Sequence, residues 1–592
     1  MAIIILLNEQ GIGEKFDMTE NNETKNRLRL RLHYLLAFIL LLHCLFFMVY
    51  WIAVGSFRAS VDQFIGDIVG LTVPYTTIVM VLTALVGTWS LVRLIRLRLA
   101  VKKGEWSSSL NNWIFFGVWL FFMAGIYAAF LVIFKQNSSQ KGVLIHLLNL
   151  IRLVSDAVLF LIAAVWLRQL ILYLRRGMLV AKRNRWLWMV GIVLVLISVV
   201  GLWLMPTLLP PNWAYQGDLP TKPALITHRG ASMLAPENTL AAAELAEANQ
   251  ALGFETDIRI SQDGVPFLMH DETLTRTTNV AEVFPDRVND RASSFTLEEL
   301  KQLNAGLWFI QKDPFGTIDD GLVSQAQLSI NQGQRIPTLA EGLELVELNG
   351  MVILFDMRYP PEDHPYYDEF FDIVLTICRE SGLNGDVWFL VDRQNVQTVL
   401  EEAPQMTRVV SVSSTDLPSP GTLLDLQYEI VNVDTGIRTR EIRAYREQGL
   451  GVNVYTIDEP WLFSQFWLSG VTSVTTNNVH TFSQLNTPFL NLPYSRYLLF
   501  WGLYGIIVAI WLASSQPEPE LEKPRQMETP DLMDFAADGD DTVDTTQPPL
   551  AQEPADGQDD AQNDDEEQAE EVGEEQAEEQ AEEQGEEQAE DV

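Results

Sequence analysis

The sequence predicts an α/β protein in which a TIM-type (βα)8 barrel is inserted between the transmembrane helices of an all-α membrane domain. Two patterns carry this prediction. Long apolar runs fill residues 32–210 and 494–514, whereas short apolar runs alternate with helix-like stretches across residues 214–490. Alternating strands and helices are typical of a parallel barrel, and about 20 consecutive apolar residues can cross a bilayer as a helix.

Six apolar segments are candidate membrane helices, five before the barrel region and one after it. The sixth is short, so aromatic residues at its ends would have to anchor it at the membrane surface. The segments are Leu32–Val54, Val69–Leu91, Trp113–Phe134, Leu153–Leu172, Trp186–Leu209 and Tyr497–Ala513.

Basic residues in the short loops predict the orientation of these helices. Lysine and arginine concentrate in residues 1–31, 93–103 and 175–185, and the intervening loops contain fewer of them. Basic loops remain in the cytoplasm. The amino-terminal segment is therefore expected inside, the barrel outside after five crossings, and the end of the chain inside after the sixth.

The net charge of −38 is mostly a property of residues 515–592, which close in near-repeats of Glu-Glu-Gln-Ala. A low-complexity acidic segment with few aromatic residues cannot bury enough apolar surface to fold, so we expect a disordered cytoplasmic tail. The sequence identifies no partner for this tail, and we expect no nucleic-acid partner. Two cysteines, Cys44 and Cys378, provide no disulfide framework.

Polar residues with a common chemistry stand at the ends of three strand-like runs. The runs are Ala224–Thr227, Phe254–Ile260 and Val265–Met269, and the residues are His228, Arg229, Glu255, Asp257 and His270. In a parallel barrel the carboxyl ends of the strands meet at one mouth. Carboxylates that bind a cation, an arginine that binds phosphate and two imidazoles that move protons suit phosphodiester cleavage.

This block resembles the glycerophosphodiester phosphodiesterase family, in particular its multi-spanning membrane branch. The similarity is carried by His228-Arg229-Gly230, Pro236–Thr239, Glu255-x-Asp257 and His270-Asp271. Weaker sequence similarity extends over residues 224–485. It implies a TIM barrel, a membrane-anchored enzyme, and metal-dependent hydrolysis of glycerophosphodiesters to an alcohol and glycerol 3-phosphate. A lysophospholipid substrate, as in a lysophospholipase D, stays open.

The resemblance also implies roles for single residues. His228 and His270 would be the acid–base pair, and Arg229 would bind a phosphate oxygen. The metal ligands would be Glu255 and Asp257, with one divalent cation, Ca²⁺ or Mg²⁺.

The third metal ligand and its neighbour depart from the family pattern. Where the family has Glu-x-Lys, this chain has Asp356 and Arg358. Asp356 would be the third metal ligand, and Arg358 would add a second positive charge for the phosphate.

Other positions leave alternatives open. Asp458 and Asn477 replace an asparagine and an aspartate of the family pattern, and we expect both to shape the substrate wall. Glu237 and Asn238 could cap the following helix or contact the site. A catalytically weak membrane scaffold with a degenerate barrel is the alternative to an enzyme.

Overall fold

The computed structural model describes residues 18–55, 73–103, 138–180 and 185–514, together with a few single residues between 58 and 66 and residue 125. The predicted tail, residues 515–592, lies outside the described residues.

Eight parallel strands close into a barrel, as predicted. Their order is β2-β10-β9-β8-β7-β6-β5-β3, and pairing of β2 with β3 closes the circle. The strands are β2 (Ala224–His228), β3 (Gly253–Ile260), β5 (Val352–Met357), β6 (Val387–Leu390), β7 (Thr407–Val412), β8 (Ile430–Asp434), β9 (Gly451–Tyr455) and β10 (Ser473–Thr476).

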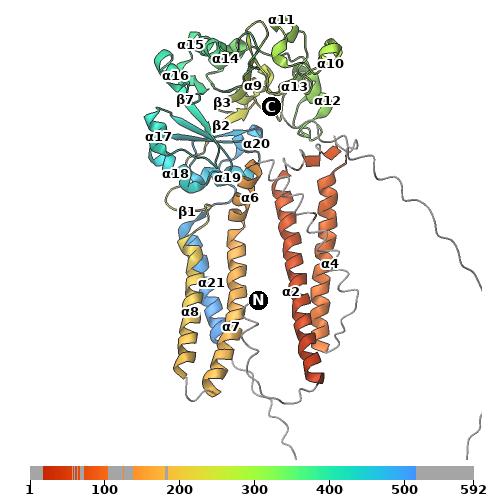
Figure 1. Ribbon diagram of the computed structural model, residues 1–592, viewed down its shortest axis with the longest axis vertical. Helices are drawn as coiled ribbons and strands as arrows, with labels where there is room; N and C mark the ends of the chain where they lie inside the picture. Colours follow the sequence, from red (N-terminus) through yellow and green to blue (C-terminus); the bar gives the residue numbers. More distant parts are fainter. Residues whose placement is uncertain are drawn as a thin grey trace, which may run out of the picture. The chain divides into compact units, whose positions relative to one another are not determined.

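Helices that follow the strands surround this sheet (Figure 1). Their apolar faces and the strands share one large buried core, because each helix must cover its hydrophobic stripe. The helices are α9 (Leu240–Ala248), α14 (Leu339–Asn349), α15 (Phe370–Glu380), α16 (Val396–Glu402), α17 (Pro420–Asp425), α18 (Thr439–Glu447), α19 (Pro460–Ser469) and α20 (Val479–Gln484), with a short helix η3 (Asn384–Asp386) before β6.

The third predicted strand is present but is not a barrel strand. β4 (Pro266–Leu268) runs antiparallel to β3, pairing Ile258 with Leu268. The expectation that His270 stands at the carboxyl end of a parallel strand is therefore wrong. Because β4 reverses direction at the turn after β3, it returns to the mouth, and the backbone N–H of Met269 donates to the Asp257 carbonyl at 2.9 Å.

An insertion between β4 and α14 consists of short helices with a small core of its own. That core contains Phe267, Met269, Leu274 and Phe295. The helices are α10 (Val280–Val283), η1 (Pro285–Arg287), η2 (Ala292–Ser294), α11 (Leu297–Leu300), α12 (Leu307–Lys312) and α13 (Gln325–Gln332). The insertion therefore packs directly beside β4, which ends two residues before His270.

Five described helices are long and apolar enough to cross a membrane. They are α2 (Met18–Ala53), α4 (Tyr75–Lys103), α7 (Arg152–Val180), α8 (Arg185–Leu208) and α21 (Tyr494–Ala513). These correspond to five of the six predicted segments, and the remaining one, Trp113–Phe134, falls outside the described residues apart from Gly125.

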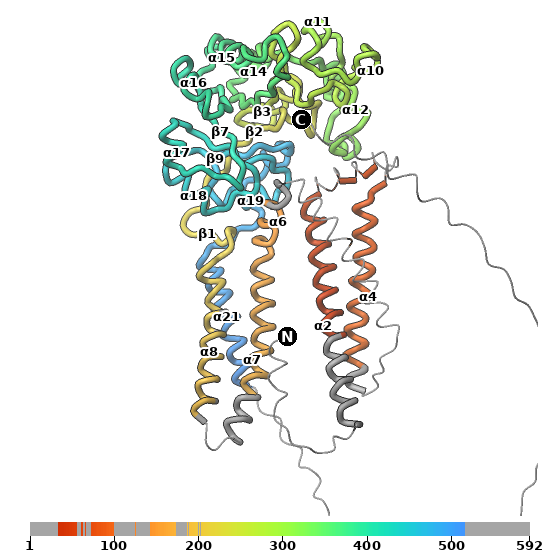
Figure 2. Tube along the Cα trace, in the orientation of Figure 1, coloured from red at the N-terminus to blue at the C-terminus, as the bar shows by residue number. Residues whose placement is uncertain are grey.

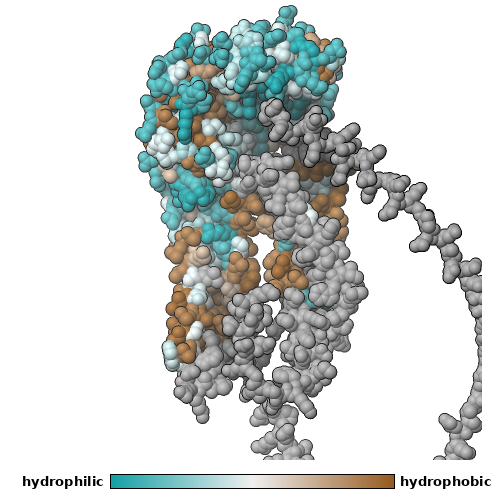
Figure 3. All heavy atoms as spheres, viewed as in Figure 1, coloured by the Kyte–Doolittle hydropathy of each residue, from teal (hydrophilic) through white to brown (hydrophobic). Residues whose placement is uncertain are grey.

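The apolar helices form two groups, α2 with α4 and α7 with α8 and α21 (Figure 2). Many of their large hydrophobic side chains are exposed, including Ile197 and Ile507. In Figure 3 the barrel domain presents a mainly hydrophilic face, whereas the visible parts of the apolar helices are mainly hydrophobic. Such exposure suits lipid contact.

Two smaller features connect these helices to the barrel. β1 (Ala214–Tyr215) pairs with β11 (Leu492–Pro493), so the chain enters and leaves the barrel domain at one place. A separate helix, α6 (Ser138–Leu150), precedes α7 and contacts α19.

Candidate active site

The carboxylate of Asp257 lies at the centre of the predicted site and is 1% exposed. Its Oδ1 accepts from Nε and Nη2 of Arg358 at 3.0 and 2.9 Å. Its Oδ2 lies 3.3 Å from Nε of Arg229 and accepts from Nδ2 of Asn238 at 3.2 Å. One buried negative charge is thus held between two guanidinium groups, which satisfies the charge and fixes both arginines.

Arg229 is positioned by the turn that follows β2. Its φ of 56° lies in the left-handed region, so the chain reverses sharply here. The backbone N–H of Arg229 donates to Oε2 of Glu255 at 3.0 Å, and Nη1 donates to Oε1 of Glu237 at 2.9 Å. Three carboxylates, from Glu237, Glu255 and Asp257, therefore set the position of this residue.

Arg276, which the sequence analysis did not identify, joins the two sides of the site. Its guanidinium donates to both oxygens of Glu237 at 2.7 and 2.9 Å and to both oxygens of Asp271 at 2.5 and 2.9 Å. Burial would raise the pKa of Glu237, but Arg276 and Arg229 together hold that pKa down to about 2. No motif marks Arg276, since it lies in the insertion, outside the strand ends.

Glu237 and Asn238 contact the site, which decides between the two roles left open by the sequence. Asn238 accepts through Oδ1 from the hydroxyl of Thr256 at 2.7 Å and donates to Asp257. The N-cap of α9 is Thr239 instead, whose hydroxyl accepts from the N–H of Ala242.

His228 has an amide partner. Its Nδ1 lies 2.9 Å from Oδ1 of Asn477, and the side-chain and backbone N–H groups of Asn477 donate to Asp458 at 2.8 and 2.7 Å. Because a carboxylate only accepts, the Asn477 amide must present its oxygen to the ring, and Nδ1 must carry the proton. Nε2, 3.9 Å from Oε2 of Glu255, is then free to accept a proton.

Asp458 and Asn477 were expected to shape the substrate wall, and the structure gives them a further role, because Asn477 contacts His228 and Asp458 holds Asn477. Both lie behind His228 because β9 and β10 are neighbours in the barrel, so the loops that follow them meet at β2. Burial, and secondarily the positive charge of Arg229, lowers the pKa of His228.

His270 has a carboxylate partner, in contrast to His228. Its Nδ1 lies 2.8 Å from Oδ1 of Asp271. Burial opposes ionisation of Asp271, but hydrogen bonds from His270 and Arg276 lower its pKa. A carboxylate that stays ionised stabilises a positively charged imidazole.

The three predicted metal ligands stand on adjacent strands. Glu255 and Asp257 are two residues apart on β3, and Asp257 is directly opposite Asp356 on β5. Burial first, and then the charges of Asp257 and Asp356, raise the pKa of Glu255. Within the described part of the chain, no three His, Cys, Asp or Glu side chains are close enough to form a metal centre.

Arg358 pairs with two of the three predicted metal ligands. Its Nη2 lies 2.9 Å from Asp356 Oδ2 as well as from Asp257 Oδ1, so it bridges two of the predicted ligands. The donor chemistry, carboxylate oxygens on neighbouring strands, nevertheless suits a hard divalent cation.

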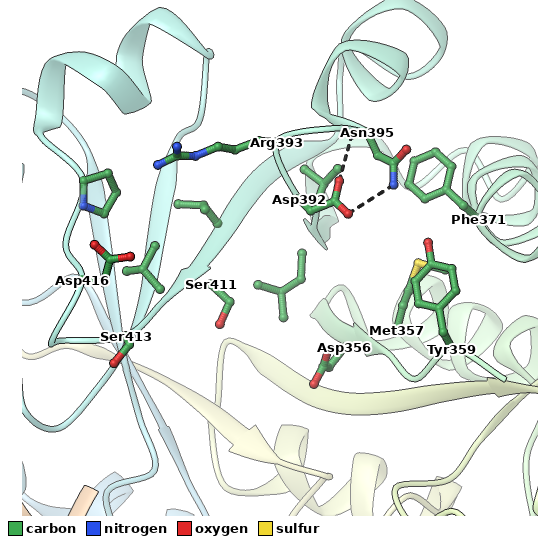
Figure 4. Close-up of a pocket in the computed structure, with 15 residues that line it drawn as sticks. Asp356, Met357, Tyr359, Phe371, Asp392, Arg393, Asn395, Ser411, Ser413 and Asp416 are labelled. Carbon is green, nitrogen blue, oxygen red and sulfur yellow. Dashed lines mark hydrogen bonds between the residues drawn. The ribbon is translucent and has the colours of Figure 1, made fainter. Parts of the chain in front are cut away.

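A pocket of about 490 Å³ opens beside Asp356 at the carboxyl ends of β5, β6 and β7 (Figure 4). Apolar side chains and hydroxyl, amide and charged groups are mixed along its lining. Among the lining residues are Met357, Tyr359, Phe371, Asp392, Arg393, Asn395, Ser411, Ser413 and Asp416. This pocket could not be predicted from the sequence, because its residues lie at or after the ends of three separate strands.

A family model described as the glycerophosphoryl diester phosphodiesterase family matches residues 228–481. The matched segment begins at His228 and includes the cluster described above. Residues 228–481 are therefore similar to this family. The expected family resemblance and barrel fold are thereby confirmed.

Curated relatives show the same similarity. Mouse (Mus musculus) glycerophosphoinositol inositolphosphodiesterase GDPD2 is 38% identical over 284 residues, which are 48% of this chain and 51% of the relative. Chicken (Gallus gallus) glycerophosphodiester phosphodiesterase domain-containing protein 5 is 39% identical over 318 residues, 53% of this chain and 51% of the relative. The chain spans about half the length of these curated relatives.

A solved phosphodiesterase from Oleispira antarctica, in complex with sn-glycerol-3-phosphate, is 24% identical. The alignment covers 44% of this chain and 95% of that chain, with a TM-score of 0.36. This score is too low for a residue-by-residue comparison.

The contacts of Asn477 generate a first prediction. Replacing Asn477 by Ala removes the group that fixes the His228 tautomer, so kcat for a glycerophosphodiester should fall by about 10²-fold with little change in KM. Asn478→Ala is the matched control, because Asn478 donates to the Asp458 carbonyl and not to His228. Equal losses in both variants would show that the loop, and not the imidazole contact, matters.

Proposed function

We propose that the barrel domain is a metal-dependent phosphodiesterase that hydrolyses glycerophosphodiesters to an alcohol and glycerol 3-phosphate. The observation that carries this proposal is the arrangement of two imidazoles with different partners around a cluster of arginines and carboxylates. His228 faces the amide of Asn477, and His270 faces the carboxylate of Asp271. The family assignment and the names of the relatives support the same activity.

Phosphate binding is proposed for Arg229 and Arg358. Both are held by Asp257, and their side chains remain 17% and 37% exposed, so each keeps a face toward the mouth. A guanidinium can present paired N–H groups to phosphate oxygens and offset their charge.

The unlike partners of the histidines support a division of roles. The unprotonated Nε2 of His228 would accept a proton from the nucleophile, which is water or a neighbouring glycerol hydroxyl. His270, whose Nδ1 lies against the Asp271 carboxylate, would donate a proton to the leaving alkoxide. Positioned proton transfer of this kind typically contributes about 10²–10⁴-fold to the rate.

Glu255, Asp257 and Asp356 are the residues proposed to hold a divalent cation, Ca²⁺ or Mg²⁺. When bound, the cation would supply charge to offset the phosphate. Arg358 now pairs with Asp257 and Asp356, which are two of these proposed ligands. With the cation bound, Arg358 would be released from one of the two carboxylates and would bind the substrate phosphate.

The pocket beside Asp356 is proposed to hold one of the two alcohol groups of the diester. Its mixed lining of hydroxyl, amide, charged and apolar groups suits a compact polar group. A water-soluble glycerophosphodiester therefore fits it better than the acyl chain of a lysophospholipid. A lysophospholipase D-type reaction would leave the acyl chain outside this pocket.

Purified full-length chain assayed against glycerophosphodiesters and lysophospholipids distinguishes the candidates. The proposal expects divalent-dependent release of glycerol 3-phosphate from the former. Release of choline from lysophosphatidylcholine alone would favour the lysophospholipase D reading, and no turnover of any substrate would favour the scaffold.

The histidine pair generates the second prediction. His228→Ala and His270→Ala should each lower kcat by about 10²–10⁴-fold, because each removes one proton-transfer group. Thermal unfolding should change little. His364→Ala is the control, since His364 contacts the Ser293 carbonyl, away from this pair. Near-normal turnover by either variant would contradict its assigned role.

The proposed cation generates the third prediction. Excess chelator should abolish hydrolysis, and Ca²⁺ or Mg²⁺ should restore it. Asp356→Glu should retain more activity than Asp356→Asn, because the ligand charge matters more to a hard cation than one methylene. Full activity in excess chelator would rule the cation out.

We also propose that the protein is a multi-pass membrane protein with an extracytoplasmic barrel, and that membrane lipid surrounds the apolar helices. The distribution of basic loops supports this orientation.

Protease added to intact cells should cut within residues 214–490 and spare the cytoplasmic acidic tail. Digestion of the tail with protection of the barrel would invert the orientation and make cytoplasmic diesters the candidate substrates.

A further inference from the structure

Helix α6 lies outside the barrel but touches the loop that follows β8. A Cβ atom added to Gly142 would stand 2.5 Å from the backbone nitrogen of Gly436 and 2.5 Å from the carbonyl carbon of Thr435. Helix and loop therefore meet backbone to backbone. Only glycine permits this approach without displacing the loop.

The rest of α6 is fixed against α19 (Figure 1). The ring of His146 packs on Phe466 with centroids 4.6 Å apart, and His146 is 3% exposed. Asn149 donates through Nδ2 to Gln465 at 3.3 Å, and its carbonyl accepts from the Trp213 indole at 3.0 Å. A residue at each end of α6 thus contacts the barrel domain, so the helix holds a defined position on it.

Asp434 links the loop that follows β8 to the loop that follows β7 through hydrogen bonds to both. Oδ1 accepts from the N–H of Gly436 at 2.8 Å and from the hydroxyl of Ser414 at 2.6 Å, and Oδ2 accepts from the N–H of Ser414 at 2.8 Å. Since both oxygens are used, a shift of Gly436 cannot leave Ser414 in place without breaking a charge-assisted hydrogen bond.

The end of β7 and the loop that follows it form one wall of the pocket beside Asp356. Ser411, Ser413 and Asp416 all line it, and Ser413 donates to Asp434 at 3.4 Å. Figure 4 shows these residues together on one side of the pocket, with Asp392 and Tyr359 on the other. The contacts therefore run without a break from α6 to the pocket wall.

We propose that α6 is a structural support of the substrate pocket and that Gly142 and Asp434 are positioning residues for its β7 wall. The segment leading into the membrane helix α7 would then be required for substrate affinity as well as for anchoring. This inference rests on the proposed function of the site and adds a dependence of that site on a segment outside the barrel.

The test compares Gly142→Leu with Gly201→Leu in the full-length chain in detergent. Gly201 lies in α8, and among the described residues no heavy atom stands within 4 Å of its added Cβ. Gly142→Leu should raise KM for the glycerophosphodiester that the parent chain hydrolyses by about tenfold or more, since misplacing a contact by about 1 Å can cost up to about 10²-fold. Its kcat should change less than KM, and Gly201→Leu should match the parent chain.

A second pair of variants covers the case in which Gly142→Leu does not fold. Gly142→Ala places only a Cβ against Gly436, and Asp434→Asn weakens the contact to Ser414 from the other side. Each should raise KM, and the double variant should raise it by less than the product of the two effects, because both act through one loop.

The outcomes separate this inference from the proposed function. A parent chain that hydrolyses no diester would overturn the proposed function itself. An active parent, with unchanged KM in the folded Gly142 variant and in Asp434→Asn, would overturn only the support role of α6. A rise in KM confined to the Gly142 and Asp434 variants would establish that role.

Discussion

The buried carboxylate of Asp257 is the constraint on which the candidate site depends. A charge with 1% exposure is tolerated only when it is paired, and here two arginines and one asparagine pair it. Arg229 follows β2 and Arg358 follows β5, so the pairing crosses the three neighbouring strands β2, β3 and β5. The carboxylate thus fixes two positive groups at the mouth.

The two histidines differ because the fold gives them different neighbours. The loops after β9 and β10 bring an amide backed by Asp458 to His228, whereas β4 and the insertion bring Asp271 and Arg276 to His270. The amide oxygen of Asn477 accepts a hydrogen bond from Nδ1 of His228 and leaves Nε2 unprotonated, whereas the carboxylate of Asp271 lies against Nδ1 of His270. One ring is therefore suited to accept a proton and the other to donate one.

Much of the barrel could be predicted, because each strand is a short apolar run that ends in a polar motif. The direction of β4 could not, since an antiparallel return and a parallel strand have the same apolar pattern. The positions of Arg276, Asp458 and Asn477 depend on which loops meet at the mouth. That information comes from closure of the barrel and is absent from local sequence.

The most direct test of this account is the kcat/KM of Asp257→Asn for a glycerophosphodiester, compared with Asp372→Asn on the exposed face of α15. Asparagine preserves the shape of the side chain but removes the charge that holds both arginines. The account predicts a loss of about 10³-fold or more for Asp257→Asn, in line with loss of preorganised charge at a phosphoryl site, and none for Asp372→Asn. A folded Asp257→Asn chain that keeps most of its activity would contradict it.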